Sequence, residues 1–180
     1  MSLKKTTGVI LTVVLLVIAT IAVGLVINNR RYKEEPICLA DAIAVGMTGD
    51  LTLTIYFRDP LMSTWLPISV EMLMDFGYDY RITVNTGVLM EHRDLLLQIA
   101  NADLIPIETE SSPGINTRIY YFFEFDGNVI FSFTETYAGM LINGNEYQWD
   151  DDKHEIFYDV IMPFLPIDAL NLLKEALGRI

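Results

Sequence analysis

The first hydrophobic pattern along the chain is a continuous run, without the polar interruptions of an amphipathic helix or strand. Residues 8–27 read GVILTVVLLVIATIAVGLVI, and basic residues flank this run on both sides. A helix rises about 1.5 Å per residue, so roughly 20 apolar residues cross the hydrocarbon core of a bilayer. The run therefore predicts a single transmembrane helix near the N-terminus.

A cleaved signal peptide is the main alternative for this run. Signal peptides have an apolar region of about 7–15 residues, followed by small residues before the cleavage site. Ala22 and Gly24 have the spacing of such small residues, but residues 25–27 continue the apolar run past them. The sequence therefore favours an uncleaved anchor.

The flanking residues bear on the orientation of this anchor. The positive-inside rule counts Lys and Arg near each end. The two ends nearly balance, with Lys4, Lys5 and the terminal amine on one side and Arg30, Arg31 and Lys33 on the other. The short N-terminal tail matches the usual layout of a signal anchor. We therefore expect a single-pass protein of the cell membrane, with its N-terminus in the cytoplasm and its C-terminal domain outside.

The chain divides into three parts on this basis. Residues 1–31 are the predicted cytoplasmic tail and transmembrane anchor, residues 32–40 a short linker, and residues 41–180 one acidic extracytoplasmic domain. No long stretch rich in Pro, Gly or Ser separates the anchor from the domain. We therefore expect the domain to lie close to the bilayer surface.

Alternation with a period of two predicts strands in the domain. Apolar residues alternate with others across 51–57, and residues 80–84 form a second strand candidate. Asp126-Gly127 and Asn143-Gly144 supply the positive φ angles that type I′ hairpin turns require. Together these two hairpins predict a four-stranded antiparallel meander over 118–149.

The turn of the first hairpin also predicts its register. If Asp126-Gly127 is a two-residue loop, Phe123 pairs with Ile130 and Phe122 pairs with Phe131. Both faces of the hairpin are then apolar. We therefore expect it to lie in the centre of the sheet and to be covered on both sides.

Helical spacing of apolar residues predicts three further elements. These are a short helix over 69–76 with Gly77 as a left-handed cap, a longer helix over 88–102, and a final helix over 168–177 ended by Gly178. Residues 156–162 fit either a strand or a broken helix, because Pro163 follows them. The fold class predicted is α+β: a single N-terminal transmembrane helix, then one domain in which an antiparallel meander of about five or six strands packs against two or three helices.

A weak internal repeat accompanies these elements. Leu66-Pro67-Ile68 and Leu165-Pro166-Ile167 each precede a predicted helix, and the second copy follows the Asn143-Gly144 hairpin. This order of hairpin, proline and helix loosely resembles the copper-amine-oxidase-like stalk domains of bacterial surface proteins. The resemblance implies a structural stalk-type surface element, and it transfers no site residues to this chain.

Charge restricts the partners of the domain. Residues 36–180 hold 22 acidic and 7 basic residues, a formal charge of −15. Such a surface repels phosphate backbones, so we expect no nucleic-acid partner. The expected partners are the membrane and a membrane-proximal protein. Thr20 and Gly24 also have the small-xxx-small spacing that lets two anchor helices approach, which leaves a homo-oligomer open.

Motifs that carry catalytic chemistry are missing from the sequence. It contains no Gly-x-Ser-x-Gly, no glycine-rich phosphate loop, no His-Glu-x-x-His and no Cys-x-x-Cys. The two histidines are His92 and His154, and His92 lies at the edge of an apolar helical stripe, as core-margin histidines do. We therefore expect no catalytic residues and no cofactor.

One acidic cluster is a candidate metal site. Asp150, Asp151, Asp152 and Glu155 lie close together, and carboxylate oxygens are the ligands that Ca²⁺ prefers. Their spacing departs from the EF-hand pattern, and Lys153 lies among them. A solvated loop is the alternative, which the sequence favours.

These features favour a membrane-anchored extracytoplasmic module that acts by interaction, as an accessory or sensory protein, without catalysis. Two alternatives stay open. One is an envelope hydrolase that uses acidic residues, which predicts an open cleft with an Asp or Glu of raised pKa. The other is the structural stalk-type element.

Overall fold

The computed structural model describes residues 38–45, 49–107, 116–137, 139–148 and 154–179. The predicted anchor over 8–27 and most of the predicted linker lie outside these residues. None of the described helices is both long and apolar enough to cross a bilayer. The described part is an antiparallel sheet with helices, so the α+β class is confirmed.

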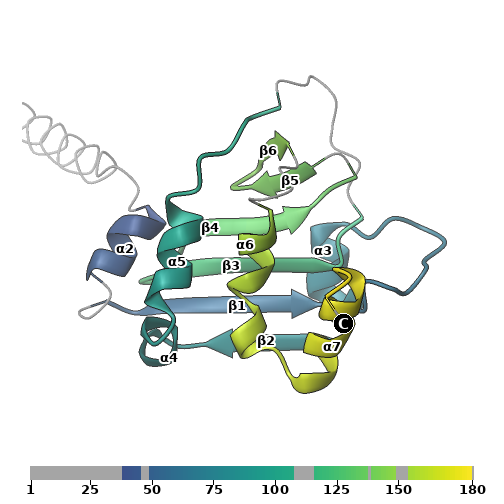
Figure 1. Ribbon diagram of the computed structural model, residues 1–180, viewed down its shortest axis with the longest axis horizontal. Helices are drawn as coiled ribbons and strands as arrows, with labels where there is room; N and C mark the ends of the chain where they lie inside the picture. The colour runs from purple at the N-terminus through teal and green to yellow at the C-terminus, as the bar shows by residue number, and fades with distance from the viewer. Residues whose placement is uncertain (1–37, 46–48, 108–115, 138, 149–153, 180) are drawn as a thin grey trace, which may run out of the picture. The chain divides into compact units, whose positions relative to one another are not determined.

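Six strands form one sheet in the order β2-β1-β3-β4-β5-β6, and all neighbouring strands are antiparallel (Figure 1). The predicted meander consists of β3 (Ile119–Phe125), β4 (Asn128–Glu135), β5 (Gly139–Ile142) and β6 (Asn145–Gln148). β1 (Leu51–Phe57) and β2 (Tyr80–Val84) extend the sheet beside β3, with the bounds that their sequence patterns predict.

Both hairpins turn as predicted. Asp126 and Gly127 have φ angles of 49° and 79°, and Asn143 and Gly144 have φ angles of 51° and 79°. These are the positive values of a type I′ turn, whose twist matches that of the flanking strands.

The predicted register of the first hairpin is wrong. Phe123 pairs with Phe131 instead of Ile130, because a β-bulge makes Ile130 an extra residue of β4. A shift of one residue turns every later side chain of a strand to the opposite face. Phe131 and Phe133 therefore lie on the same face of the sheet as Phe123.

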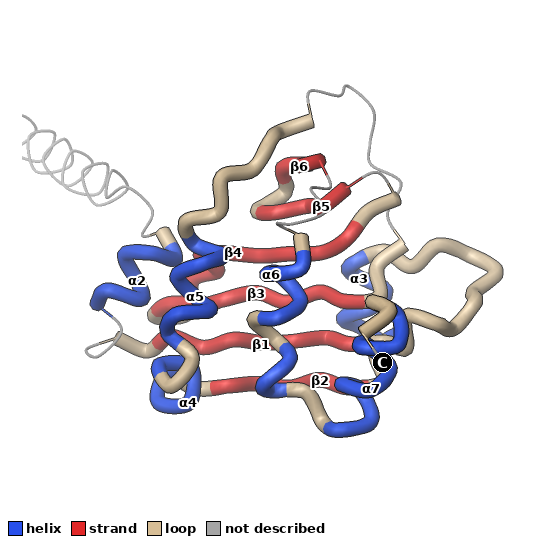
Figure 2. Tube along the Cα trace, viewed as in Figure 1, coloured by secondary structure: helices blue, strands red, loops and turns tan. Residues whose placement is uncertain are grey.

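Helices cover this face of the sheet. α2 (Leu39–Val45), α5 (Arg93–Ala100) and α6 (Glu155–Asp159) lie across the strands, with α7 (Ile167–Ala176) following α6 (Figures 1 and 2). The core between the two layers is aliphatic and aromatic, and its fully buried members include Leu51, Leu53, Ile55, Phe57, Leu89, Leu96, Tyr121, Phe123, Phe133 and Phe157. The described residues contain six α-helices, more than the two or three expected.

The opposite face is covered only in part. α3 (Val70–Met72) continues into the π-helical segment η1 (Leu73–Gly77), and a small separate cluster forms there from Tyr56, Ile68 and Leu73. Tyr120 and Phe122 of the first hairpin pack against this cluster and remain half-buried. The hairpin is therefore central, as expected, but its outer face is less completely covered than its sequence predicts.

The helix predicted over 88–102 is two helices. α4 (Thr86–Met90) ends before His92, whose φ of −113° and ψ of 27° are not helical, and α5 follows. A continuous helix would place Arg93 in the same apolar stripe as Leu89 and Leu96. The break leaves Arg93 exposed while both leucines stay fully buried.

Gly77 does not have the role predicted for it. Its φ lies outside the positive range, so it is not a left-handed cap. A Cβ at this position would lie 2.9 Å from the carbonyl oxygen of Met72. The small size of Gly77, rather than its conformational freedom, is what this tight turn requires.

The C-terminal elements resolve one open prediction and confirm another. Residues 156–162 belong to a broken helix, in which α6 gives way to the 3-10 turn η2 (Met162–Phe164) containing Pro163. α7 ends at Gly178, whose φ is 66°. The amides of Gly178 and Arg179 donate to the carbonyl oxygens of Glu175 and Lys174, at 3.0 and 2.8 Å, which is the Schellman motif.

Gly139 provides a test of the second hairpin. A Cβ at Gly139 would lie 1.9 Å from the backbone carbonyl oxygen of Tyr147, so Gly139→Ala must displace β6. We expect this substitution to lower the free energy of unfolding by about 2 kcal/mol or more. Denaturation of the compact fragment 37–180, followed by far-ultraviolet circular dichroism, measures the change.

Gly87→Ala is the matched control for this measurement. Its Cβ would meet only Oδ1 of Asn85, at 3.5 Å, in a helix where alanine is preferred to glycine. We expect its free energy of unfolding to be unchanged or raised by up to about 1 kcal/mol. Equal losses for the two variants would contradict the close approach of β5 and β6.

Candidate functional site

The bulge in β4 determines where Glu135 lies. Phe131, Phe133 and Glu135 alternate along β4, so the carboxylate lies on the face that the helices cover, at the end of the strand. The hydroxyl of Tyr158, on α6, donates a hydrogen bond of 2.8 Å to Oε2 of Glu135. A carboxylate is thus held at the margin of an otherwise apolar layer.

Arg118 lies beside this end of the sheet, immediately before β3, and only 6% of it is exposed. Its Nη2 donates to the carbonyl oxygen of Met62 at 3.0 Å and to Oγ1 of Thr64 at 2.9 Å. Its Nη1 is buried and has no hydrogen-bond partner among the described residues. Leaving a buried donor unpaired costs about 1–3 kcal/mol, and more for a charged group. One half of the guanidinium is therefore hydrogen-bonded to the loop, and the other half is buried without a partner among the described residues.

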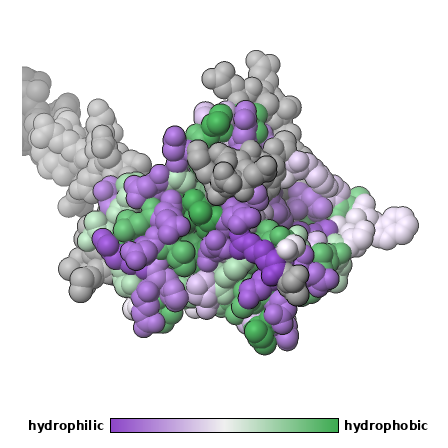
Figure 3. All heavy atoms as spheres, in the orientation of Figure 1, coloured by the Kyte–Doolittle hydropathy of each residue, from purple (hydrophilic) through white to green (hydrophobic). Residues whose placement is uncertain are grey.

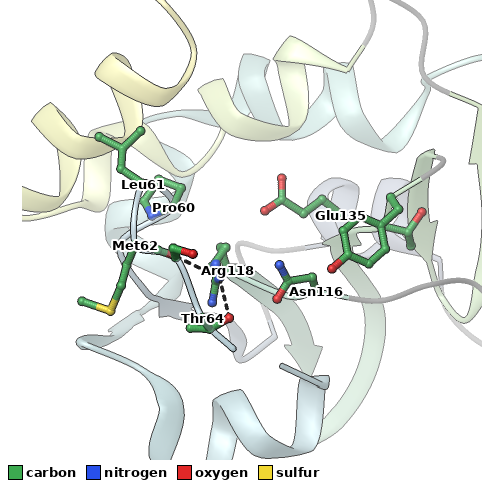
Figure 4. Close-up of a pocket in the computed structure, with 10 residues that line it drawn as sticks. Pro60, Leu61, Met62, Thr64, Asn116, Arg118 and Glu135 are labelled. Carbon is green, nitrogen blue, oxygen red and sulfur yellow. Dashed lines mark hydrogen bonds between the residues drawn. The ribbon is translucent and has the colours of Figure 1, made fainter. Parts of the chain in front are cut away.

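Two adjoining pockets open around these groups. The first has a volume of about 410 Å³ and is polar, lined by Ser63, Thr64, Asn116, Arg118, Glu135 and Thr136 among others. Figure 4 shows the side chains of Arg118, Asn116 and Glu135 around one hollow, with the loop that carries Met62 and Thr64 as its other wall.

The second pocket, of about 420 Å³, is more apolar. It shares Pro60 and Glu135 with the first and is otherwise lined by Ile119, His154, Tyr158, Leu173, Ala176 and Leu177. Glu135 thus lies at the boundary between a polar and an apolar compartment.

Burial dominates the electrostatics of this end of the sheet. It raises the pKa of Glu135, and the hydrogen bond from Tyr158 and the charge of Arg118 oppose this rise only in part. Burial, followed by repulsion from Arg58, lowers the pKa of Arg118. Burial and the neighbouring Glu135 raise the pKa of Tyr158 far above its ordinary value. The carboxyl group is therefore easier to protonate than one in water.

The loop that forms one wall of the first pocket presents apolar side chains to solvent. Trp65 is fully exposed, and Leu66, Leu61 and Met62 are 72%, 49% and 43% exposed. In contrast, Figure 3 shows hydrophobic and hydrophilic residues interspersed on the face of the molecule where the helices lie. Phe76 and Ile167 are also exposed, so the loop is distinguished by carrying four such residues close together in sequence.

The acidic cluster predicted from the sequence lies elsewhere, and only Glu155 of it is described. Glu155 is in the first turn of α6 and accepts a hydrogen bond from Nη2 of Arg179. The hydrogen bond from Arg179 to Asp159 is the main cause that raises the pKa of this arginine. Asp150, Asp151 and Asp152 lie outside the described residues, so the calcium site stays a prediction. Among the described residues, no group of three or more His, Cys, Asp or Glu is arranged to hold a metal ion.

The histidines occupy different surroundings. His92 is half-buried at the margin of the core, as expected, with its ring edge-on to Phe164 at 5.1 Å between centroids. His154 lies edge-on to Tyr158, at 6.3 Å, and lines the apolar pocket.

Sequence reasoning missed Arg118 and Glu135. The available signal was the alternation Phe131-x-Phe133-x-Glu135, which puts an acid on the same face as two aromatic residues. It went unused because the predicted register made both faces of the hairpin apolar, so it did not single out the face on which Glu135 lies. Arg118 gives no comparable signal, because its burial depends on a loop that is distant in sequence.

Comparison of the chain with models of protein families, with curated proteins and with solved structures finds no match. What the pocket can bind is therefore inferred from the chemistry of its own side chains. The polar side chains that line the first pocket can hydrogen-bond a ligand, and the apolar side chains that line the second can pack against hydrocarbon.

Glu135→Gln tests the electrostatics of the site. Because its pKa is raised on folding, Glu135 binds protons more tightly in the folded state, so its contribution to the free energy of unfolding falls as pH rises above the ordinary value of 4.5. Each unit of pKa elevation corresponds to about 1.4 kcal/mol. We subtract the free energy of unfolding of the unsubstituted protein from that of Glu135→Gln. We expect this difference to become more positive with rising pH and then to level off.

Chemical denaturation of fragment 37–180 at several pH values between about 4.5 and 8 measures this difference. The exposed carboxylate of Glu175 supplies the control, and Glu175→Gln should show a smaller pH dependence. A difference for Glu135→Gln that is flat with pH would show that burial does not disfavour this carboxylate.

Proposed function

We propose that this chain is a membrane-anchored extracytoplasmic binding module, an accessory or sensory protein that acts by recognising a ligand rather than by catalysis. The observation that carries the proposal is the open polar pocket of about 410 Å³ that Arg118, Asn116 and Glu135 line among others, next to a more apolar pocket. A few polar side chains that converge on a pocket are the groups that fix the orientation of a bound ligand.

The membrane location rests on the sequence. The apolar run over 8–27 has the length of a transmembrane helix, and the linker that follows is short. A domain tethered in this way works near the bilayer, so a membrane-proximal protein is the partner that we propose for it. The exposed apolar loop around Trp65 is a surface suited to such a contact.

One observation favours the envelope hydrolase as a second candidate. Glu135 is a carboxyl group of raised pKa in an open pocket, the feature which that hypothesis predicts. Glycoside hydrolysis needs two carboxyl groups across the scissile bond. Among the described residues that line the two pockets, Glu135 is the only one with a carboxyl group. Turnover of a glycoside that Glu135→Gln abolishes would favour the hydrolase over the binding module.

Reporter fusions after Ile180 test the orientation. We expect a reporter that is active only outside the cytoplasm to be active in this fusion, because the module that we propose lies outside the cytoplasm. A reporter that is active only in the cytoplasm should be silent at the same position. The reverse pair of results would contradict an extracytoplasmic domain.

A charged substitution in the apolar run tests the anchor. Leu16→Arg combined with Val17→Arg should shift the protein from the membrane pellet to the soluble fraction after an alkaline wash, because each arginine at a helix centre costs about 2.5–3.5 kcal/mol on insertion scales. The volume-conserving pair Leu16→Val and Val17→Leu should remain in the pellet. The intact mass of the pelleted protein should include residues 1–31, and a mass that lacks them would indicate signal-peptide cleavage.

A further inference from the structure

The first pocket contains polar atoms that solvent reaches and that the protein does not hydrogen-bond. Oδ1 of Asn116 accepts a hydrogen bond of 3.2 Å from the amide of Ile68, which fixes the side chain and leaves Nδ2 as a donor. Oε2 of Glu135 accepts from Tyr158, which leaves Oε1 as an acceptor. In the described part of the chain, every buried side-chain nitrogen or oxygen without a partner belongs to an arginine, so these two atoms are accessible. With the exposed hydroxyl of Ser63, they offer a ligand both donors and acceptors.

The charges of this pocket favour an uncharged ligand. The charged side chains among its described lining residues are Arg118 and Glu135, which have opposite signs. Nη2 of Arg118 is hydrogen-bonded to the loop and its Nη1 is buried, so the guanidinium offers no anchor to an anion. Its charge still lowers the pKa of Glu135, so the carboxylate is already balanced in part and has less need of a cation.

The walls of the pocket differ in polarity. Figure 4 shows Pro60 and Leu61 on one side of the hollow and Asn116 and Glu135 on the other. Tyr137 lines the same pocket and is 67% exposed, so its ring is accessible to a ligand. A ligand that matches these walls has hydroxyl groups around its edge, each a donor and an acceptor, and C–H groups on its faces that pack against an aromatic ring. A pyranose sugar has this structure.

We propose that the first pocket binds an uncharged pyranose saccharide, with its hydroxyls on Asn116, Glu135 and Ser63 and one C–H face on the ring of Tyr137. This inference rests on the proposed function of the pocket as a binding site, and it adds the class of ligand. The volume of about 410 Å³ lies in the range of small-molecule sites. The second pocket takes no part in this binding.

Sugars that share one ring and differ in charge test the proposal on the full chain in lipid nanodiscs. Saturation-transfer difference NMR, with empty nanodiscs subtracted, gives the dissociation constants. We expect at least one of methyl glucoside, methyl galactoside, methyl mannoside and N-acetylglucosamine to bind with a dissociation constant of about 10 mM or less. The uronate and the 2-amino sugar of the ring that binds best should each bind about fivefold or more weakly. Cyclohexanol, which has a ring with one hydroxyl, should also bind about fivefold or more weakly.

Variants locate the bound sugar. Tyr137→Ala should weaken binding by about fivefold or more, and Tyr137→Phe, which keeps the ring, should retain most of it. Asn116→Asp keeps an oxygen for the amide of Ile68 but replaces the donor Nδ2, and it should weaken binding by about fivefold. Trp65→Ala is the control, because it removes a fully exposed aromatic ring that does not line the pocket, and it should leave binding unchanged.

The ligand series uses the unsubstituted protein, so it tests the proposal even if a variant does not fold. A uronate that binds more tightly than its uncharged parent would overturn the choice of an uncharged ligand, and full binding by Tyr137→Ala would overturn the position of the sugar. No binding of any sugar at about 50 mM would overturn the ligand class.

Adenosine separates failure of this inference from failure of the proposed function. Adenosine that binds where the sugars do not, and that Tyr137→Ala weakens, would overturn the saccharide and leave the pocket as a ligand site. The reporter and anchor experiments do not depend on either ligand, so the membrane-anchored location has its own test.

Discussion

The β-bulge at Ile130 is the constraint on which both the core and the pocket depend. Without it, the two-residue turn at Asp126-Gly127 would direct Phe131, Phe133 and Glu135 away from the helices. With it, the rings of Phe131 and Phe133 lie in the core, and the carboxylate of Glu135 lies on the same face of the sheet. One extra residue in one strand thus decides which face of β4 is buried.

With this register, aromatic packing fixes the position of α6 against the sheet. The rings of Phe133 and Phe157 stack with centroids 5.1 Å apart and an angle of 3° between their planes. The buried hydroxyl of Tyr121 donates to the carbonyl oxygen of Phe157 at 3.0 Å. Tyr158 follows Phe157 directly, so the same contacts bring its hydroxyl to Glu135. The core therefore positions Tyr158 and Glu135 at the pocket.

Arg118 links the pocket to the exposed apolar loop. Its Nη2 holds Met62 and Thr64, which precede the fully exposed Trp65. The guanidinium that lines the first pocket therefore also holds the loop that presents Trp65 to solvent. One side chain thus connects the end of the sheet, the pocket and the exposed loop.

The sequence alone determined the features that depend on neighbouring residues. Strand alternation over 51–57, the positive φ angles of Asp126-Gly127 and Asn143-Gly144, and the glycine cap of the last helix are local, and all are present as predicted. The apolar run over 8–27 is local in the same sense, although the described residues do not include it. Each of these features follows from backbone sterics or from side-chain periodicity within a few residues.

Only the tertiary structure decided the register of β4, the break at His92 and the assembly of the pocket. A bulge forms because the core gains two phenylalanine rings, and the break between α4 and α5 keeps Arg93 in solvent while the leucines beside it stay buried. Arg118 and Glu135 become site residues because elements distant in the chain bury them together. The free energy that fixes them comes from packing across the sheet, which no local pattern in the sequence encodes.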